Sequence, residues 1–456
     1  MPDAARARQP EVSDPPRGGG VARSAAITSV SQAMAMLAGG VLAVLVAVRI
    51  GNNPQTDGFF AAYGIYAVAV LLAQTARMSI VARIVEPGGF DRYLGAALLL
   101  FLAFGVAFAV LGGPVADLLT GDLPQAASDT ARTALLLLWP AVGGQLFGAL
   151  AAALLGTRGD FGTAAIAFGG GGLVSILAFL ALEPRLGIDA VATAILIGST
   201  LTAAVLAVRL VRTGWRPAPR ALVRVRDGLS GAWIMVLSSL AFLISQLGYL
   251  VSLAVAARIG DGIVTIYSYS YAAMAIAVAL LASVPSIVLA APLATDWDRS
   301  PAGLLEHHRR VWITGLLLLV PLAAAGWLLG DEVAGALLTK FTDVEVDLTV
   351  ELFLILMPTV VWSLGASLPQ TALYTLGRYR LVAAIAAVVV ALQAAISLAA
   401  GALDDVDLLA AAVPIAGTLS FLAMLGAVAR EYLRDSVPML GAGLARVLAV
   451  AVLSFG

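Results

Sequence analysis

The chain has 456 residues, of which 61% are hydrophobic and 12% charged, and its mean hydropathy is +0.97. A soluble protein does not carry so many unbroken apolar runs, so the composition indicates a membrane protein. The net charge of −1 argues against a nucleic-acid partner, and the absence of cysteine excludes disulfides and thiolate metal sites.

Long apolar runs predict the membrane-spanning helices, because a bilayer core of about 30 Å needs about 20 apolar residues per helix. Segment 437–456 is marginal, since Arg446 at its middle would cost about 2.5–3.5 kcal/mol on insertion scales. The other runs predict twelve core helices, at 25–48, 58–82, 94–116, 133–156, 162–182, 189–211, 231–257, 262–290, 311–329, 351–376, 381–401 and 406–429. The first run is long enough to span and follows a long polar leader, so we expect a retained helix rather than a cleaved signal.

The basic residues predict the orientation. Most of the 27 lysines and arginines fall on the side of the N-terminus when the helices alternate across the membrane. The other side receives Arg49, Arg132, Arg185, Arg258 and Lys340. Short loops rich in arginine stay in the cytoplasm, so we expect a cytoplasmic N-terminus and a multi-pass protein of a bacterial cytoplasmic membrane.

Short motifs recur in the same order in both halves. They are AVRIG at Ala47 and AARIG at Ala256, SIV at Ser79 and Ser286, LWPAV and LMPTV around Pro140 and Pro358, and AAIA at Ala164 and Ala383. Such internal repeats are typical of transporters whose two halves enclose one cavity. We therefore expect an all-α protein with two pseudo-symmetric six-helix lobes.

The repeat also predicts domain boundaries. They are a cytoplasmic tail at 1–24, an N-lobe at 25–211, a basic linker at 212–230, a C-lobe at 231–430 and a C-terminal segment at 431–456. The linker can also be read as a plain cytoplasmic loop that lies on anionic headgroups. Pro140 and Pro358 are the paired candidates for hinges, although a proline within a span is often only a packing kink.

Polar residues within the spans are candidates for a transport cavity. On the second predicted helix, Arg77 shares a helical face with Tyr63, Tyr66 and Gln74. This stripe would line a polar cavity, unless Arg77 only extends to the headgroups. Further candidates for substrate contact are Gln32, Gln246, Tyr267 and Tyr271, whose alternative role is to anchor the protein at the membrane interface.

Charged residues at the predicted helix ends are candidates for gating. Asp57 follows Thr56 at the start of the second helix, where either residue would cap the helix. Alternatively, Asp57 forms an ion pair with Arg49 that closes one gate, and Arg258 with Asp261 is the counterpart in the second half. The sequence contains no nucleotide-binding or hydrolase motif in a plausible setting, and no residues at metal-ligand spacing. We therefore expect neither an enzyme nor a metal or cofactor.

Two stretches carry a resemblance to a known family. The first is ITSVSQAMAMLAGGVLAVLVAVRIGNNPQTDGFFAAYGIYAVAVLL, and the second is ARIGDGIVTIYSYSYAAMAIAVALLASVPSIVLAAPLA. Both resemble the MurJ/MviN family of lipid II flippases, within the multidrug/oligosaccharidyl-lipid/polysaccharide (MOP) exporter superfamily. The resemblance implies a MOP/MATE-like fold and a flippase for a lipid-linked, polyprenyl-diphosphate glycan. Its implied partners are that lipid, the bilayer and proteins of cell-wall synthesis.

The chain departs from the family at the arginines that the resemblance places in the central cavity. The first predicted helix has no arginine between Ser29 and Val48. At the positions where the resemblance implies a cavity arginine on the second and eighth helices, this chain has Val70 and Tyr271. The exact cargo is therefore left open. Energy would come from the membrane potential or from a proton or sodium gradient. The alternatives are a cation-coupled drug exporter of the same superfamily, which normally needs a buried carboxylate, and a degenerate regulator of cell-wall assembly.

Overall fold

The computed structural model describes residues 38–84, 89–216, 225–278, 320–321, 323–375 and 378–432. These ranges contain helices and turns and no strand. The first half has a helix at Ala38–Arg49, α2 (Pro54–Ile84), α3 (Gly89–Thr120), α4 (Gln125–Thr157), α5 (Phe161–Leu186) and α6 (Asp189–Arg212). The second half has α8 (Val225–Ile259), α9 (Ile263–Val278), a helix at 323–337, α12 (Asp343–Leu356), α13 (Pro358–Thr375), α14 (Tyr379–Leu403) and α15 (Val406–Tyr432).

Eight helical segments in the described ranges are long and apolar enough to cross a membrane, so the predicted all-helical membrane fold is confirmed. The predicted helices 25–48, 262–290 and 311–329 are described only in part, and segment 437–456 lies outside the described residues. The span predicted at 351–376 is longer than expected. Its helix begins at Asp343, because Thr342 and Glu345 form a capping box there.

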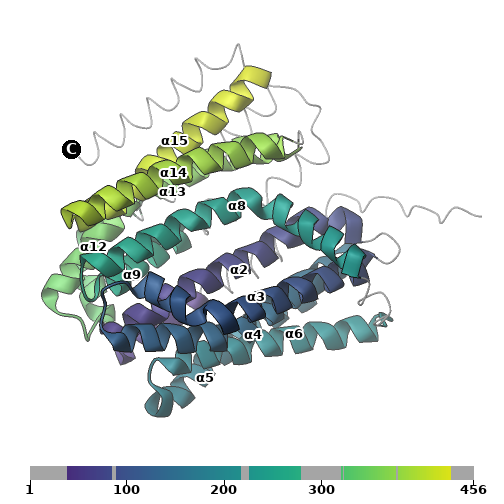
Figure 1. The fold of residues 1–456 in the computed structure, drawn as a ribbon, viewed down its shortest axis with the longest axis horizontal. Coiled ribbons are helices and arrows are strands. Elements are labelled where there is room, and N and C mark those ends of the chain that lie inside the picture. The colour runs from purple at the N-terminus through teal and green to yellow at the C-terminus, as the bar shows by residue number, and fades with distance from the viewer. Residues whose placement is uncertain are drawn as a thin grey trace, which may run out of the picture.

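The helices form two groups joined along α8 (Figure 1). We call the described residues up to Arg216 the N-lobe and those from Val225 the C-lobe. In the N-lobe, α4 packs against α2, α3 and α6, and α5 packs against α6. α8 contacts α2 and α3 on one side and α14 on the other, and α14 and α13 contact α15. α8 is therefore the main surface that the C-lobe presents to the N-lobe.

Glycines let α5 and α6 approach until their backbones touch. A Cβ atom at Gly198 would overlap the Ser175 hydroxyl and the Gly171 carbonyl oxygen. Thr202 closes the same contact by donating a hydrogen bond to the Ala167 carbonyl at 3.1 Å. Small residues that allow such close approach stabilise helix pairs in membranes, where the hydrophobic effect does not.

The close contact between α5 and α6 gives a first prediction. Gly198→Ala places a methyl group against backbone atoms that belong to α5, so the two helices must separate. We expect a loss of stability of about 1–3 kcal/mol, as for other overpacked interiors. The measurement is the midpoint of thermal unfolding in detergent.

Gly170→Ala is the matched control, because a Cβ at Gly170 meets nothing within 4 Å. It also changes one glycine of the same helix pair to alanine, and we expect an unchanged midpoint. Equal midpoints for the two variants would mean that the backbone contact at Gly198 adds nothing to stability.

Candidate functional site

Charged and polar residues gather at the two ends of the helix bundle. α2, α9 and α12 begin at the end that lies on the left of Figure 1, which we call the capped end. α3, α5, α8 and α14 begin at the opposite end. We call this the basic end because its described residues include Arg92, Arg158, Arg209, Arg212, Arg216, Arg378 and Arg380.

Asp57 joins the lobes at the capped end. Its side chain is fully buried and accepts hydrogen bonds from the amides of Gly262, at 2.7 Å, and Thr265, at 2.8 Å. The Thr265 hydroxyl also donates to Asp57, at 2.6 Å. The Gly262 amide lies directly before α9 and the Thr265 amide in its first turn, so a carboxylate of the N-lobe caps a helix of the C-lobe.

The local sequence explains why α9 takes its cap from another lobe. The first amides of a helix have no acceptor within the helix, and a side chain usually supplies one. Position 262, just before α9, is a glycine with φ of +82°, and the first turn of α9 has no acidic residue. Asp57 supplies the missing acceptor, and its negative charge suits the positive end of the α9 dipole.

The prediction that Thr56 or Asp57 caps α2 is wrong. Asn53 takes that role, since its Oδ1 accepts hydrogen bonds from the amides of Gln55 and Thr56 at 3.0 and 3.1 Å. The Thr56 hydroxyl points back to the carbonyls of Gly51 and Asn53. Asp57, one turn further along, is therefore free to bind the C-lobe.

Two more polar contacts cross between the lobes at the capped end. Asn52 donates to Glu345 at 2.6 Å, and Lys340 donates to the Arg49 carbonyl oxygen. Glu345 uses its other oxygen to accept hydrogen bonds from Thr342, so it caps α12 and binds the N-lobe at once. The start of α12 thus holds the loop at 49–53, while the start of α9 holds Asp57 in the first turn of α2.

The predicted ion pairs are not formed. Asp57 binds α9 instead of Arg49, and Arg49 takes part through its backbone carbonyl. Arg258 lies over Gly121, where an added Cβ would be 3.2 Å from the Arg258 Cγ. Among the described residues, Arg209 and Asp160 form an ion pair, and this pair lies at the basic end.

A band of tyrosines lies between the lobes next to this capped end. Tyr63 and Tyr66 of α2 have ring centroids 5.6 Å apart, and Tyr249 of α8 stacks on Tyr271 of α9 at 4.2 Å. Gly64 brings α2 close to α8, since a Cβ there would lie 3.5 Å from the Tyr249 ring. Phe60 meets Tyr269 edge to face at 5.0 Å, which joins the lobes by an aromatic contact as well.

Some hydroxyl groups in this band are buried without a partner. Within the described part of the chain, the Tyr269 hydroxyl has no hydrogen-bond partner, whereas the hydroxyls of Tyr267 and Ser268 lie beside Ser252 and Tyr249 without well-formed hydrogen bonds. A buried polar group without a hydrogen bond is uncommon and calls for an explanation. The C-lobe face of the interface therefore offers neutral hydroxyl groups rather than charges.

The structure brings together only part of the predicted site. Tyr63, Tyr66, Tyr267 and Tyr271 join the band, and Gln246 is half-buried on α8. Gln32 and the side chains of Gln74 and Arg77 lie outside the described residues. Pro140 lies inside an unbroken α4, while Pro358 begins α13 directly after the turn at Met357 that ends α12.

The sequence reasoning missed Asn52, Gly262, Thr265, Lys340 and Glu345. One signal could have found the α9 contact. A glycine directly before a helix without an acidic first turn leaves the first amides without a local acceptor. The missing acceptor then has to come from another element, and Asp57 is the fully buried carboxylate among the described residues.

We expect Asp57→Asn to weaken the closure of the capped end. The side-chain NH2 group of the asparagine would face a backbone N–H group of α9, and both are hydrogen-bond donors. A buried donor left without an acceptor costs about 1–3 kcal/mol. Because the chain has no cysteine, Ser268→Cys gives a single reporter thiol in the buried band. We expect a membrane-impermeant maleimide to label it several-fold faster in the Asp57→Asn background.

Asp261→Asn is the matched control. It makes the same change of acid to amide on the neighbouring loop, but the Asp261 side chain is exposed. Its labelling rate should equal that of the parent. If both variants label at the same rate, Asp57 does not hold the capped end closed.

Comparison with known proteins gives a family match and a common fold. The family model described as "Lipid II flippase MurJ" matches residues 90–455. This range contains the second stretch quoted for the resemblance and excludes the first. No individual curated protein matches the chain significantly.

Solved structures share the fold at low sequence identity. A lipid II flippase MurJ in an inward closed conformation has a TM-score of 0.75 and 17% identity, over 88% of this chain and 87% of that one. An inward-facing MATE multidrug resistance transporter of the MOP superfamily has a TM-score of 0.68 and 18% identity, over 90% and 96%. A MOP superfamily transporter from Pyrococcus furiosus has a TM-score of 0.67 and 17% identity, over 90% and 96%. The chain therefore has the MOP fold.

Proposed function

Because the chain belongs to the MurJ family of lipid II flippases, we propose that it moves a lipid-linked cell-wall glycan precursor, such as lipid II, across a bacterial cytoplasmic membrane. Transport runs from the cytoplasmic to the outer leaflet by alternating access. The protein then acts as a transporter and not as an enzyme. Proteins that make or use the precursor are its expected partners.

The arginine distribution supports the direction of transport. The basic end, with the linker between the lobes, faces the cytoplasm, and the capped end faces outward. The conformation described here is then closed toward the outside. The MurJ structure that shares this fold is described as an inward closed conformation of that protein.

One observation carries the mechanism: the polar contacts that close the capped end join one lobe to the other. Asp57 with α9 and Asn52 with Glu345 both pair a residue of the N-lobe with the C-lobe. Rocking one lobe against the other breaks these contacts together and opens the interface to the outside. A polar headgroup held between the lobes then avoids the cost of crossing bare hydrocarbon.

The tyrosine band supports a glycan as part of the cargo. Tyr271 stands where the family resemblance places a cavity arginine, and it stacks on Tyr249. The Tyr269 hydroxyl, which has no partner among the described residues, can exchange hydrogen bonds with sugar hydroxyls. Arg77 is the cation that we propose for the diphosphate, because Arg binds phosphate oxygens in a bidentate manner. A membrane potential would supply about 2.3 kcal/mol per charge per 100 mV.

The described carboxylates favour a flippase over a cation-coupled drug exporter. Asp57 is buried, but it lies between the lobes and already accepts hydrogen bonds from two amides and a hydroxyl. A coupling site would need a carboxylate that is free to exchange a cation with the substrate. The match of residues 90–455 to the family of lipid II flippases favours a flippase over a degenerate regulator.

Cross-linking the capped end tests this mechanism. Asn52→Cys with Glu345→Cys places one thiol on each lobe at a contact that must break during transport. In vesicles that contain the purified chain and a lipid-linked glycan, we expect a short thiol cross-linker to stop transfer. Reduction of a cleavable cross-link should restore it.

Asp117→Cys with Ser128→Cys is the matched control pair. Ser128 donates a hydrogen bond to Asp117 at 2.5 Å between α3 and α4, so both thiols belong to the N-lobe. Cross-linking this pair should leave transfer unchanged. Transfer that continues through fully cross-linked Asn52→Cys/Glu345→Cys protein would refute alternating access at the capped end.

A further inference from the structure

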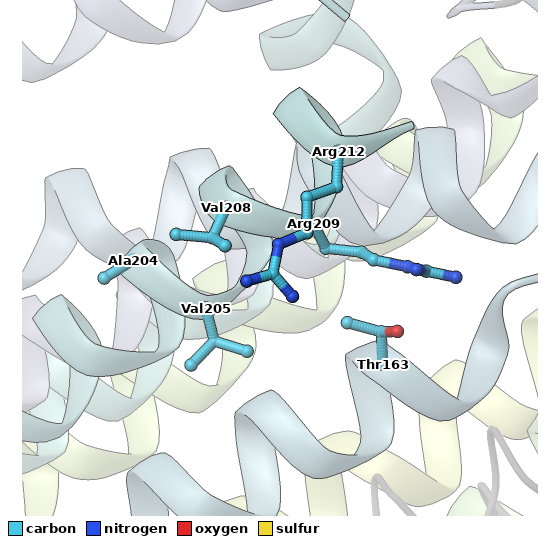
Figure 2. Close-up of a pocket in the computed structure, with 6 residues that line it drawn as sticks. All are labelled: Thr163, Ala204, Val205, Val208, Arg209 and Arg212. Carbon is cyan, nitrogen blue, oxygen red and sulfur yellow. The ribbon is translucent and has the colours of Figure 1, made fainter. Parts of the chain in front are cut away.

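A cleft at the basic end lies away from the interface between the lobes. It has a volume of about 350 Å³ and is lined by Thr163 of α5 and by Ala204, Val205, Val208, Arg209 and Arg212 of α6. Figure 2 shows the Arg212 side chain folded back beside the two valines, the Arg209 side chain pointing away from them, and Thr163 on the facing helix. The cleft combines an apolar wall with a cationic end.

The apolar wall faces the surroundings of the bundle. Val208 is 51% exposed, and Ile166 on the neighbouring α5 is 73% exposed. Large apolar side chains with this exposure, on helices that are long and apolar enough to span, are in contact with lipid tails. An acyl chain can therefore lie along α6 within the cleft.

The two arginines differ in how much of their charge is available. The Arg209 Nε donates to Asp160 at 2.6 Å. Burial alone would raise the pKa of Asp160, but hydrogen bonds from Arg209 and Thr163 outweigh it and hold the pKa below its usual value. Arg209 is thus fixed in place by an ionised partner. Arg212 is exposed and has no ion pair among the described residues.

Neighbouring arginines make this corner of the protein cationic. Arg158 donates to the Thr213 hydroxyl at 2.9 Å, directly after α6. Asp160 neutralises one of these charges, so the cleft remains suited to an anion.

We propose that the cleft between α5 and α6 binds one anionic phospholipid, with its phosphate on Arg212 and an acyl chain along Ala204, Val205 and Val208. Guanidinium groups bind phosphate with directed hydrogen bonds. The apolar wall selects a lipid over a free phosphate, and the cationic end selects an anionic headgroup over a zwitterionic one. The cytoplasmic leaflet as the source of the lipid rests on the orientation given under the proposed function.

The headgroup is tested with Arg212→Gln in the full chain. We expect its dissociation constant for phosphatidylglycerol, measured by native mass spectrometry from detergent, to rise about five-fold, which corresponds to about 1 kcal/mol for one arginine near a membrane surface. Arg216→Gln is the matched control, because Arg216 is also exposed but does not line the cleft. It should bind as the parent does. Phosphatidylcholine should bind the parent more weakly, and inorganic phosphate should not displace phosphatidylglycerol.

The acyl chain is tested with Val208→Trp, which fills the apolar wall. Val211→Trp is its control, since Val211 is 56% exposed on the same helix but lies outside the lining. Only Val208→Trp should weaken phosphatidylglycerol binding. An exposed position on a surface helix accepts tryptophan without a change in the core, and an unchanged thermal midpoint would verify this for both variants.

The proposal is overturned if Arg212→Gln and Arg216→Gln weaken binding equally, since the lipid would then sense only the overall charge of this end. It is also overturned if phosphatidylcholine binds as well as phosphatidylglycerol, or if inorganic phosphate displaces the lipid. These binding measurements need no transport. A chain that fails to transfer a lipid-linked glycan but retains phosphatidylglycerol at this cleft would refute the proposed function alone.

Discussion

The first turn of α9 depends on a carboxylate from the other half of the chain. The amides of Gly262 and Thr265 find their acceptor in Asp57, 0% exposed at the boundary between the lobes. When the lobes separate, these amides and the carboxylate lose each other and must bind water instead. Water can reach them only when that same end opens. Capping of α9 and closure of the capped end are therefore one event, and a half-open state leaves buried polar groups unpaired.

Hydropathy predicts most of the helices because each span is a run of apolar residues with polar or glycine boundaries. The predicted 189–211 and 406–429 agree with α6 and α15 to within a few residues, since Asp189 and Asp405 end the apolar runs. The same criterion misplaces the start of α12. Its first turn carries Asp343 and Glu345, which favour a helix N-terminus but lower the hydropathy. At this boundary the capping residues therefore predict a helix start, whereas the hydropathy predicts a loop.

The site could be predicted only where side chains alone define it. Spacing along one helix places Tyr63 next to Tyr66, and the structure shows their rings in contact. The sequence singles out Asp57 because it lies at the start of a predicted span and close to Arg49. Its partners cannot be recognised in the sequence, because they include backbone amides from the other half of the chain. Almost every residue has a backbone amide, so residue type does not show which one binds the carboxylate. The link between Asn52 and Glu345 likewise needs the arrangement of α2 and α12 in space.

The contacts within and between the lobes differ in a way that suits rocking. Inside the N-lobe, Gly171 and Gly198 bring two backbones together, and such a contact cannot slide without a clash. Between the lobes, hydrogen bonds of side chains such as Asp57 and ring edges such as that of Phe60 on Tyr269 make the contact. These groups can part and find water or a substrate hydroxyl in place of each other. The close packing of α5 on α6 and the polar contacts that close the capped end therefore both suit the rocking motion that we propose for transport.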